Sequence, residues 1–362
     1  MRETIELEQA LERQRKGTLI IDVRTPAEFA EATIPGAVNV PIFSNEERVQ
    51  VGTLFKQQGK RDARKLGVQL VAPKIPLLMD QIENLRRDHP GPVIVFCWRG
   101  GMRSLAMTSF MNLAGIPAQQ LLGGHKGFRR KILDYFEQQQ WPPVFVLRGL
   151  TGTGKTRILQ QLAALNYPVV DLEGLANHRG SAFGALGLEP QPSQKKFEAL
   201  LWARLEELKE SPYLITEGES LHIGRIMVPK TFHQAMQIQP SLWVNASLDV
   251  RTQIILEDYP ALDQLKEQFK KPIHALKERL GGKVVTEFLE LLDTGQWDKL
   301  VRELMVRYYD PLYMHTLPER RVEVELETVE SATQKVAAAL DELAKKIPLA
   351  PLWQRGEHRA RG

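Results

Sequence analysis

Continuous apolar runs alternate with amphipathic segments along the first 137 residues of the chain. The runs at residues 19–23 (LIIDV) and 92–96 (PVIVF) predict strands that are buried on both faces, as in a parallel sheet. Apolar positions within residues 75–87 and 104–114 recur at helical spacing. This alternation of strand and helix predicts an α/β fold built on a parallel sheet.

The same alternation resumes after residue 143 and then changes character. Apolar runs at residues 144–147, 167–170 and 213–217 predict three further strands. The final third of the chain follows mainly helical periodicity, with one strand expected at residues 321–327 (RVEVELE). We therefore expect a second α/β domain that carries a helical C-terminal region.

Length and composition also favour two globular domains. A chain of 362 residues with 43% hydrophobic content is too long for a single core. The polar segment QQQWPP ends in two prolines, which interrupt a helix and are typical of a boundary. The predicted division is a domain at residues 1–137, a linker at residues 138–143 and a domain at residues 144–362.

The sequence carries no sign of export or of a membrane anchor. No apolar run approaches the roughly 18 residues of a membrane span, and the first residues alternate acids and bases. A single cysteine cannot form an internal disulfide and fits a reducing compartment. We expect a cytoplasmic protein without membrane association, and a monomer, since no pattern demands a dimer.

A phosphate-binding pattern, G-x-x-x-x-G-K-[ST], follows the predicted linker directly. An apolar run precedes it and an amphipathic helix follows it, so that backbone N–H groups and a helix N-terminus face an anion. Gly149, Gly152 and Gly154 let the backbone approach the phosphates. Lys155 adds a mobile positive charge, and Thr156 is placed to hold Mg²⁺. These five residues predict a P-loop.

Polar residues after two of the predicted strands are candidates for a second group of contacts. Glu217 stands where a P-loop protein usually keeps an aspartate for the metal, which leaves magnesium use and nucleotide hydrolysis open. His178 is a lone histidine, and such residues are as often structural as catalytic. The candidates for a second anion or substrate contact are Glu173, His178, Arg179, Ser181, Glu217 and Glu219.

The only cysteine, Cys97, lies at the carboxyl end of a predicted strand, where open α/β sheets bind their ligands. Glycines, arginines and a helix starting near Ser104 should surround the thiol with positive charge and N–H donors. The predicted anion loop around Cys97 comprises Trp98, Arg99, Gly100, Gly101, Met102, Arg103 and Ser104.

Four segments in this order resemble a rhodanese domain: IDVRTPAEF (21–29), IPGAVNVP (34–41), the Cys97 loop and LLGGHKGF (121–128). Rhodanese loops usually span six residues from cysteine to arginine. This loop spans seven, as in dual-specificity phosphatases, which favours a tetrahedral anion of phosphate size. Those phosphatases generally have histidine before the cysteine, whereas this chain has Phe96.

A rhodanese-like domain fused to a P-loop domain, with the motifs CWRGGMRS, GLTGTGKT, LEGLANHRGS and EGES, resembles the tRNA 2-selenouridine synthase family. The resemblance implies conversion of 2-thiouridine to 2-selenouridine at the wobble position of the tRNAs for Lys, Glu and Gln. It implies selenophosphate and geranyl diphosphate as co-substrates, with S-geranylation first and no tightly bound cofactor. Selenophosphate synthetase becomes a candidate partner.

The resemblance also suggests a role for each loop. Cys97 would accept selenium or position the selenium donor, and the sequence does not separate these two roles. We hypothesise that the segment from Gly149 to Thr156 holds the diphosphate of geranyl diphosphate, because the usual acidic aspartate is missing. Rival interpretations are a sulfurtransferase or phosphatase fused to a P-loop kinase, and a nucleotide-regulated binding protein.

The distribution of charge along the sequence gives electrostatic support to tRNA binding. The formal net charge is +4, and the first 137 residues hold 20 Lys+Arg against 15 Asp+Glu. The excess is densest at residues 56–65 and 125–131, with a further basic tail at residues 354–362. Such patches suit a phosphate backbone, although a solvated surface remains the alternative. The candidate tRNA contacts are Lys56, Lys60, Arg61, Arg64, Lys65, Arg129 and Arg130.

Overall fold

The computed structural model describes residues 3–89, 91–218, 220–259, 262–314 and 317–346. Glu219 and the basic tail lie outside the described residues. The chain divides into two compact units, each of which is described by itself. The first unit comprises residues 1–137 with 198–200, and the second comprises residues 138–197 with 201–362.

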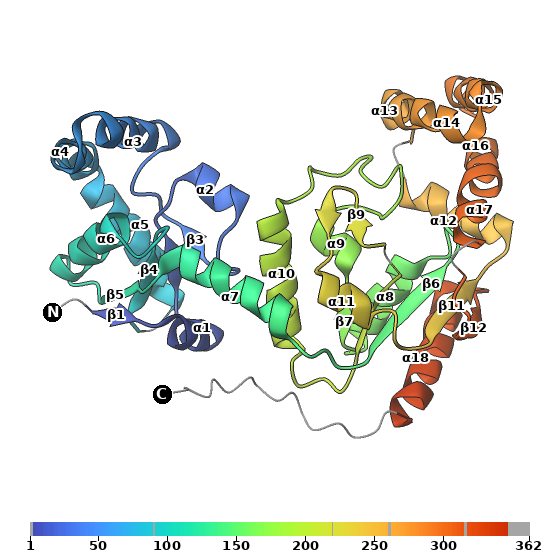
Figure 1. Cartoon of the computed structure of the whole chain (residues 1–362), viewed down its shortest axis with the longest axis horizontal. Coiled ribbons are helices and arrows are strands. Elements are labelled where there is room, and N and C mark those ends of the chain that lie inside the picture. Colours follow the sequence, from blue (N-terminus) through green and yellow to red (C-terminus); the bar gives the residue numbers. More distant parts are fainter. Residues whose placement is uncertain (1–2, 90, 219, 260–261, 315–316, 347–362) are drawn as a thin grey trace. The chain divides into compact units, whose positions relative to one another are not determined.

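A five-stranded parallel sheet in the order β1-β5-β4-β2-β3 forms the centre of the first unit (Figure 1). The central strand β4 is fully buried, as its continuous apolar sequence requires. All strands run the same way, so their carboxyl ends meet at one edge of the sheet. The strands are β1 Thr4–Ile5, β2 Ile20–Asp22, β3 Val38–Asn39, β4 Val93–Phe96 and β5 Ala118–Leu121.

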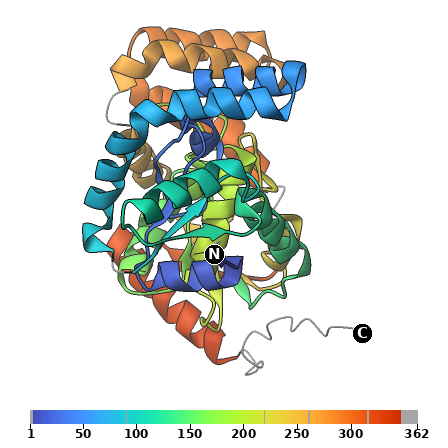
Figure 2. The same ribbon diagram turned by 90° about the vertical axis from the view of Figure 1, so that its left-hand side faces the viewer.

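Helices cover this sheet, and two of them form a hairpin outside it. Helices α3 and α4 lie side by side in both views (Figures 1 and 2) and are joined at Gly59, whose φ of 93° suits glycine. Capping boxes start α2 at Thr25 and α3 at Ser44. The helices are α1 Leu7–Arg15, α2 Pro26–Glu31, α3 Asn45–Gln58, α4 Lys60–Val71, η1 Ala72–Lys74, α5 Ile75–Leu85, η2 Arg86–Asp88, α6 Met102–Leu113 and α7 Gly124–Gln138.

The second unit also contains a five-stranded parallel sheet, in the order β12-β11-β6-β8-β7. The P-loop strand β6 is central, between β8 and β11. A separate antiparallel pair joins β9 and β10. The strands are β6 Val144–Gly149, β7 Val169–Val170, β8 Leu214–Glu217, β9 His222–Ile223, β10 Ile226–Met227, β11 Ser241–Asn245 and β12 Arg321–Glu325.

Two apolar cores hold the second unit. One packs α8 and α18 against the sheet through residues such as Leu147, Ile158 and Val336. The other joins the helices of the extension around Phe269 and Phe288. The helices are α8 Lys155–Ala164, α9 Leu172–Ala176, α10 Gln194–Glu207, α11 Lys230–Ala235, α12 Leu248–Asp258, α13 Leu262–Ala275, α14 Lys277–Leu280, α15 Gly282–Asp293, α16 Trp297–Leu304, η3 Met305–Tyr309, α17 Asp310–Met314 and α18 Val329–Lys345.

The predicted α/β fold class with parallel sheets and a helical C-terminal region is confirmed. Some details differ from the expectation, as the helix after the cysteine and the strand β11 show. The helix after the cysteine begins at Met102 rather than near Ser104. The strand β11 lies at the start of the region that was expected to hold one strand only; its apolar run, Leu242 to Val244, is only three residues long.

Candidate active sites

Cys97 lies directly after the buried strand β4, in a loop that is closely packed against the first turn of α7. Its side chain is 3% exposed. The loop can approach this segment because position 124 is glycine, with a φ of 55°. A Cβ at Gly124 would lie 2.2 Å from the carbonyl oxygen of Cys97 and 2.6 Å from the amide nitrogen of Gly100. The LLGGHKGF motif therefore serves the geometry of the cysteine loop.

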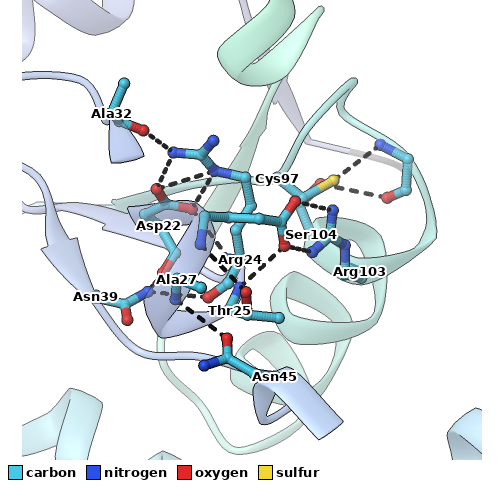
Figure 3. A network of polar contacts seen from close by, with 12 residues as sticks. Asp22, Arg24, Thr25, Ala27, Ala32, Asn39, Asn45, Cys97, Arg103 and Ser104 are labelled. Carbon is cyan, nitrogen blue, oxygen red and sulfur yellow. Dashed lines mark hydrogen bonds and ion pairs between the residues drawn. The ribbon is translucent and has the colours of Figure 1, made fainter. Parts of the chain in front are cut away.

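The sulfur of Cys97 is held by two neighbours in its own loop and helix (Figure 3). The Gly101 N–H donates to Sγ at 3.2 Å, and the Ser104 hydroxyl lies 3.1 Å from Sγ. Gln120 on β5 donates to the Ser104 hydroxyl at 2.8 Å and to the carbonyl oxygens of Gly100 and Gly101. Sequence reasoning missed Gln120, because the half-polar sequence of β5 was not recognised as a strand. Gln120 fixes the loop that surrounds the thiol.

Arg103, the predicted anion-binding arginine, forms a two-pronged ion pair with Glu28 in α2 (Figure 3). The Nη1–Oε2 distance is 2.5 Å and the Nη2–Oε1 distance is 3.1 Å. Burial opposes ionisation of Glu28, yet the hydrogen bonds and charge of Arg103 hold the pKa of its carboxyl below the usual range. Arg99 is exposed. Glu28, which the sequence did not single out, thus controls the charge of the loop.

A buried ion pair between Asp22 and Arg24 supports this end of the sheet (Figure 3). The shortest distance, between Arg24 Nη2 and Asp22 Oδ2, is 2.6 Å, and Arg24 also donates to the carbonyl oxygen of Ala32. The Thr33 hydroxyl donates to the same carboxylate at 2.9 Å. Because both charges are paired, the IDVRTPAEF segment acts here as a scaffold for β2 and α2.

Exposed apolar and basic side chains form the rim of the cysteine loop. Trp98 is 36% exposed and packs against His125, and Met102 is 53% exposed. Arg64 of α4 reaches this rim, with Nη2 3.8 Å from the sulfur of Met102. Among the predicted tRNA contacts, Arg129 is half-buried, whereas those exposed are Lys56, Lys60, Arg61, Arg64, Lys65 and Arg130.

The P-loop lies at the carboxyl end of β6 and leads into α8, as the pattern predicted. Lys155 donates to the carbonyl oxygens of Gly149 at 3.1 Å and of Leu150 at 3.2 Å. Gly152 passes close to α12, since a Cβ there would lie 2.8 Å from the carbonyl oxygen of Arg251. Arg251, which sequence reasoning missed, pairs with Asp310 at 2.7 Å and donates to the loop at Thr151. This pair, in which Arg251 is buried and Asp310 is partly buried, fixes the guanidinium that contacts the loop.

Three carboxylates gather beside the start of α8. The Thr156 hydroxyl donates to Glu173 at 3.2 Å, and the Glu173 backbone N–H donates to Glu217 at 2.5 Å. Glu217 is 2% exposed, and its Oε2 atom is buried without a hydrogen-bond partner. Burial, and then the charges of Asp171 and Glu173, raise the pKa of Glu217 well above the usual value. Glu217 therefore resembles a neutral acid more than a metal ligand.

The remaining candidates, His178, Arg179 and Ser181, lie in the loop after α9 and have different surroundings. His178 is buried and accepts the Gly180 N–H at 3.1 Å, and burial followed by the charge of Arg179 lowers its pKa. Arg179 packs on the Tyr259 ring and donates to the carbonyl oxygen of Leu186. This loop brings Ser181 alone of the three to the pocket described next.

A pocket of about 750 Å³ opens beside the P-loop. One side is the sheet face that carries Arg148 and Trp243, which alternate with the core residues Leu147 and Leu242. The opposite side is the π-helical turn η3 with α17. We call this space the aromatic pocket; it is lined by residues including Gly149, Ser181, Met236, Trp243, Leu312 and Tyr313.

Within the described ranges, no group of three or more His, Cys, Asp or Glu side chains has a geometry that would hold a metal ion. Of the helices among the described residues, none is both long and apolar enough to cross a membrane.

Comparison with known proteins finds a matching family model for each of the two units. The family model described as tRNA 2-selenouridine synthase AAA domain matches residues 142–346, and the one described as Rhodanese-like domain matches residues 5–131. The solved structure of a gluconokinase from Sinorhizobium meliloti aligns with 57% of this chain and with 96% of the gluconokinase chain, at 16% identity and a TM-score of 0.28.

Curated relatives match over most of their length. A tRNA 2-selenouridine synthase of Nitrosomonas europaea is 34% identical over 351 residues, covering 84% of this chain and 90% of the relative. That of Shewanella denitrificans is 32% identical over 355 residues, covering 90% of this chain and 95% of the relative. With its rhodanese-like and P-loop units, the chain belongs to the tRNA 2-selenouridine synthase family.

Proposed function

We propose that the protein converts 2-thiouridine to 2-selenouridine at the wobble position of the tRNAs for Lys, Glu and Gln, in two steps in the cytoplasm. Geranyl diphosphate first alkylates the sulfur, and selenophosphate then replaces the geranyl-sulfur group. The observation that supports the proposal is that two different loops follow strands of parallel sheets, one with a thiol at Cys97 and one with an amine at Lys155.

The order of the steps follows from leaving-group chemistry. Sulfur double-bonded to C2 of the pyrimidine leaves poorly. Once S2 attacks C1 of the geranyl group, a C–S bond forms, the C1–O bond breaks, and its electron pair departs with diphosphate while N3 loses its proton. The alkylated sulfur can then leave as geranylthiol when selenium attacks C2, and water finally removes the phosphoryl group as phosphate.

The P-loop is the candidate site for the first step. Lys155 contacts two carbonyl oxygens of its own loop. Its ammonium group therefore lies at the opening of the P-loop, where a diphosphate would bind. There it would stabilise the negative charge that develops on the leaving diphosphate. Thr156 and Glu173 supply the oxygen ligands that Mg²⁺ prefers and would hold an ion beside the diphosphate. Bound Mg²⁺ would neutralise further charge there.

For the second step, electron counting favours a positioning role for Cys97 over a covalent one. Selenophosphate carries selenium at the level of selenide, so a Cys97–selenium bond would require a two-electron oxidant. The proposed reaction supplies none. We therefore assign the cysteine loop to binding the phosphoryl oxygens of selenophosphate, with the thiol beside the selenium atom that attacks C2.

The tRNA would approach the cysteine loop along α4. The exposed basic residues of α3 and α4 suit phosphate contacts, and Arg64 joins this surface to the rim at Met102. Trp98 on the same rim offers a partly exposed ring for base stacking. Selenophosphate synthetase is the expected supplier of the selenium donor.

The test is mass spectrometry of the wobble nucleoside after incubation of the protein with 2-thiouridine tRNA. Geranyl diphosphate alone should yield S-geranyl-2-thiouridine, and later addition of selenophosphate should yield 2-selenouridine. Lys155→Ala should lose the first product but should still convert tRNA that was geranylated beforehand. Cys97→Ala should show the reverse pattern. Unchanged thiouridine with folded wild-type protein would refute the proposal.

A further inference from the structure

We propose that the aromatic pocket binds the hydrocarbon chain of a prenyl diphosphate, and that the Tyr313 ring stabilises the positive charge that forms on its allylic carbon. This inference rests on the proposed function and assigns a binding site to the hydrocarbon chain of its substrate. The pocket lies where such a chain must begin, because Gly149 belongs both to the P-loop and to the pocket lining.

Tyr313 links the two parts of the site. The Lys155 ammonium lies over its ring, 5.9 Å from the ring centre, while Tyr313 also lines the pocket. An aromatic face attracts a cation at this range. Since Lys155 would contact the diphosphate, the proposal places the carbon that carries this leaving group beside the same ring. Loss of diphosphate from an allylic carbon creates positive charge at that carbon.

The wall of the pocket suits a flexible apolar chain. Met236 and Trp243 are buried, at 1% and 5% exposure, and Leu312 stands on α17 beside Tyr313. Tyr308, which also lines the pocket, lies in the π-helical turn η3. Such turns are rare and frequent at functional sites. A volume of about 750 Å³ is within the ordinary range for small-ligand sites.

The polar side of the pocket is already ordered. Arg148 donates to the Ser241 hydroxyl at 3.1 Å and to Gln237 at 3.1 Å. Its guanidinium is thus fixed in the pocket wall, which also contains the polar side chains of His233, Glu319 and Arg320. The apolar part of the wall, around Met236, Trp243 and Leu312, would hold the hydrocarbon chain, and the polar part would face the acceptor base, whose sulfur forms the new bond.

Binding measurements separate the chain from the diphosphate. Titration calorimetry would compare inorganic diphosphate with geranyl diphosphate on the full-length protein. Burial of the chain should make geranyl diphosphate bind roughly 100-fold more tightly and with a negative heat-capacity change. The substitution Leu312→Trp, which fills the pocket, should reduce this ratio to below about tenfold and leave inorganic diphosphate unaffected. The matched control is Leu165→Trp, at an exposed leucine after α8 that does not line the pocket.

The outcomes distinguish the pocket from the proposed function. Equal binding of the two ligands by the wild type, or an unchanged ratio in Leu312→Trp, would overturn the pocket assignment while the diphosphate role stands. Absence of binding for both ligands would refute the diphosphate role of the P-loop itself.

Kinetics of geranyl transfer test the ring separately. Tyr313→Phe should keep kcat within about threefold, whereas Tyr313→Leu should lower it roughly 10-fold with little change in KM, because a cation–π contact acts on the charged transition state. Equal kcat for Tyr313→Leu and the wild type would overturn the role of the ring.

Discussion

Replacing Gly124 with alanine should disable the cysteine loop without removing any functional group. The added Cβ would lie 2.2 Å from the Cys97 carbonyl oxygen and 2.6 Å from the Gly100 nitrogen. Both atoms belong to backbone, so no side chain can rotate away to make room. Either the loop that positions the thiol or the first turn of α7 must move.

The size of the effect follows from this geometry. A separation of about 3.0 Å is the closest that real Cβ atoms show, so the Cys97 carbonyl must shift by roughly 0.8 Å. A misplacement of about 1 Å at a reacting centre costs on the order of 100-fold in rate. Alanine at a φ of 55° adds about 1–2 kcal/mol of backbone strain, and overpacking adds about 1–3 kcal/mol. We expect a loss of roughly 2–5 kcal/mol in the unfolding free energy.

The assay uses tRNA that has been geranylated beforehand, so that only the selenium step is measured. Gly124→Ala should reduce kcat/KM for 2-selenouridine formation by about 100-fold and leave geranyl transfer at the P-loop within about twofold. Gly127→Ala is the matched control three residues later. A Cβ there meets nothing closer than the Leu122 carbonyl oxygen at 3.8 Å, and alanine in helix α7 should raise stability by about 0.5–1 kcal/mol.

Two results would contradict this reasoning. Selenation within threefold of the wild type in Gly124→Ala would mean that the loop does not need its close packing on this segment. Equal losses in Gly124→Ala and Gly127→Ala would show that the assay reports general damage to α7 rather than the position of Cys97.

Three further predictions concern charge. Glu28→Gln should lower the unfolding free energy by about 1–2 kcal/mol at pH 7, because it removes half of the Arg103 ion pair. Since the pKa of Glu28 is lowered in the folded state, this difference in unfolding free energy should be present above the ordinary glutamate pKa of about 4.3 and disappear as the pH falls below it. Urea titrations at several pH values would measure it. A difference that persists in acid would contradict the assignment. Glu217→Gln should behave oppositely: because burial raises the pKa of Glu217, the variant should gain stability over the wild type as the pH rises above about 4.3, and a loss of stability at pH 7 would mean that the carboxylate form is needed. Joint substitution of Lys60→Ala and Arg61→Ala should weaken tRNA binding and reduce the slope of log K against log salt by about 1–2 in filter-binding assays, whereas parallel lines would exclude both residues from phosphate contact.

The sequence predicts the elements whose side chains are buried on both faces. The strands β4, β6 and β8 were expected because their apolar runs are continuous, and each ends at a candidate loop. Strand β5 was not expected, since its sequence AQQL is half polar. One of those polar residues, Gln120, proved to be the support of the Ser104 hydroxyl. A buried polar residue with a structural role thus makes the strand that contains it difficult to predict from the sequence.

Partners that are distant in the sequence explain the rest of what was missed. The segment Thr25–Glu28 reads as a capping box, and the structure does form one, which leaves no local reason to expect a second task for Glu28. Its ion pair with Arg103 joins positions 75 residues apart. The Arg251–Asp310 pair beside the P-loop spans 59 residues in the same way. Pairing of this kind follows from the fold and not from a local pattern.

The state of the two loops suggests why binding of each anion should be selective. In both, the cation that a motif assigns to the ligand already has protein partners: Arg103 is bound to Glu28, and Lys155 is bound to the Gly149 and Leu150 carbonyl oxygens. An incoming anion must therefore replace these contacts, so only ligands that offer additional interactions bind well. At the P-loop, the aromatic pocket would provide that gain through the hydrocarbon chain. At the cysteine loop, the gain would come from the N–H groups around the thiol. Inorganic phosphate and diphosphate, which are abundant in cells, would then compete weakly at both sites.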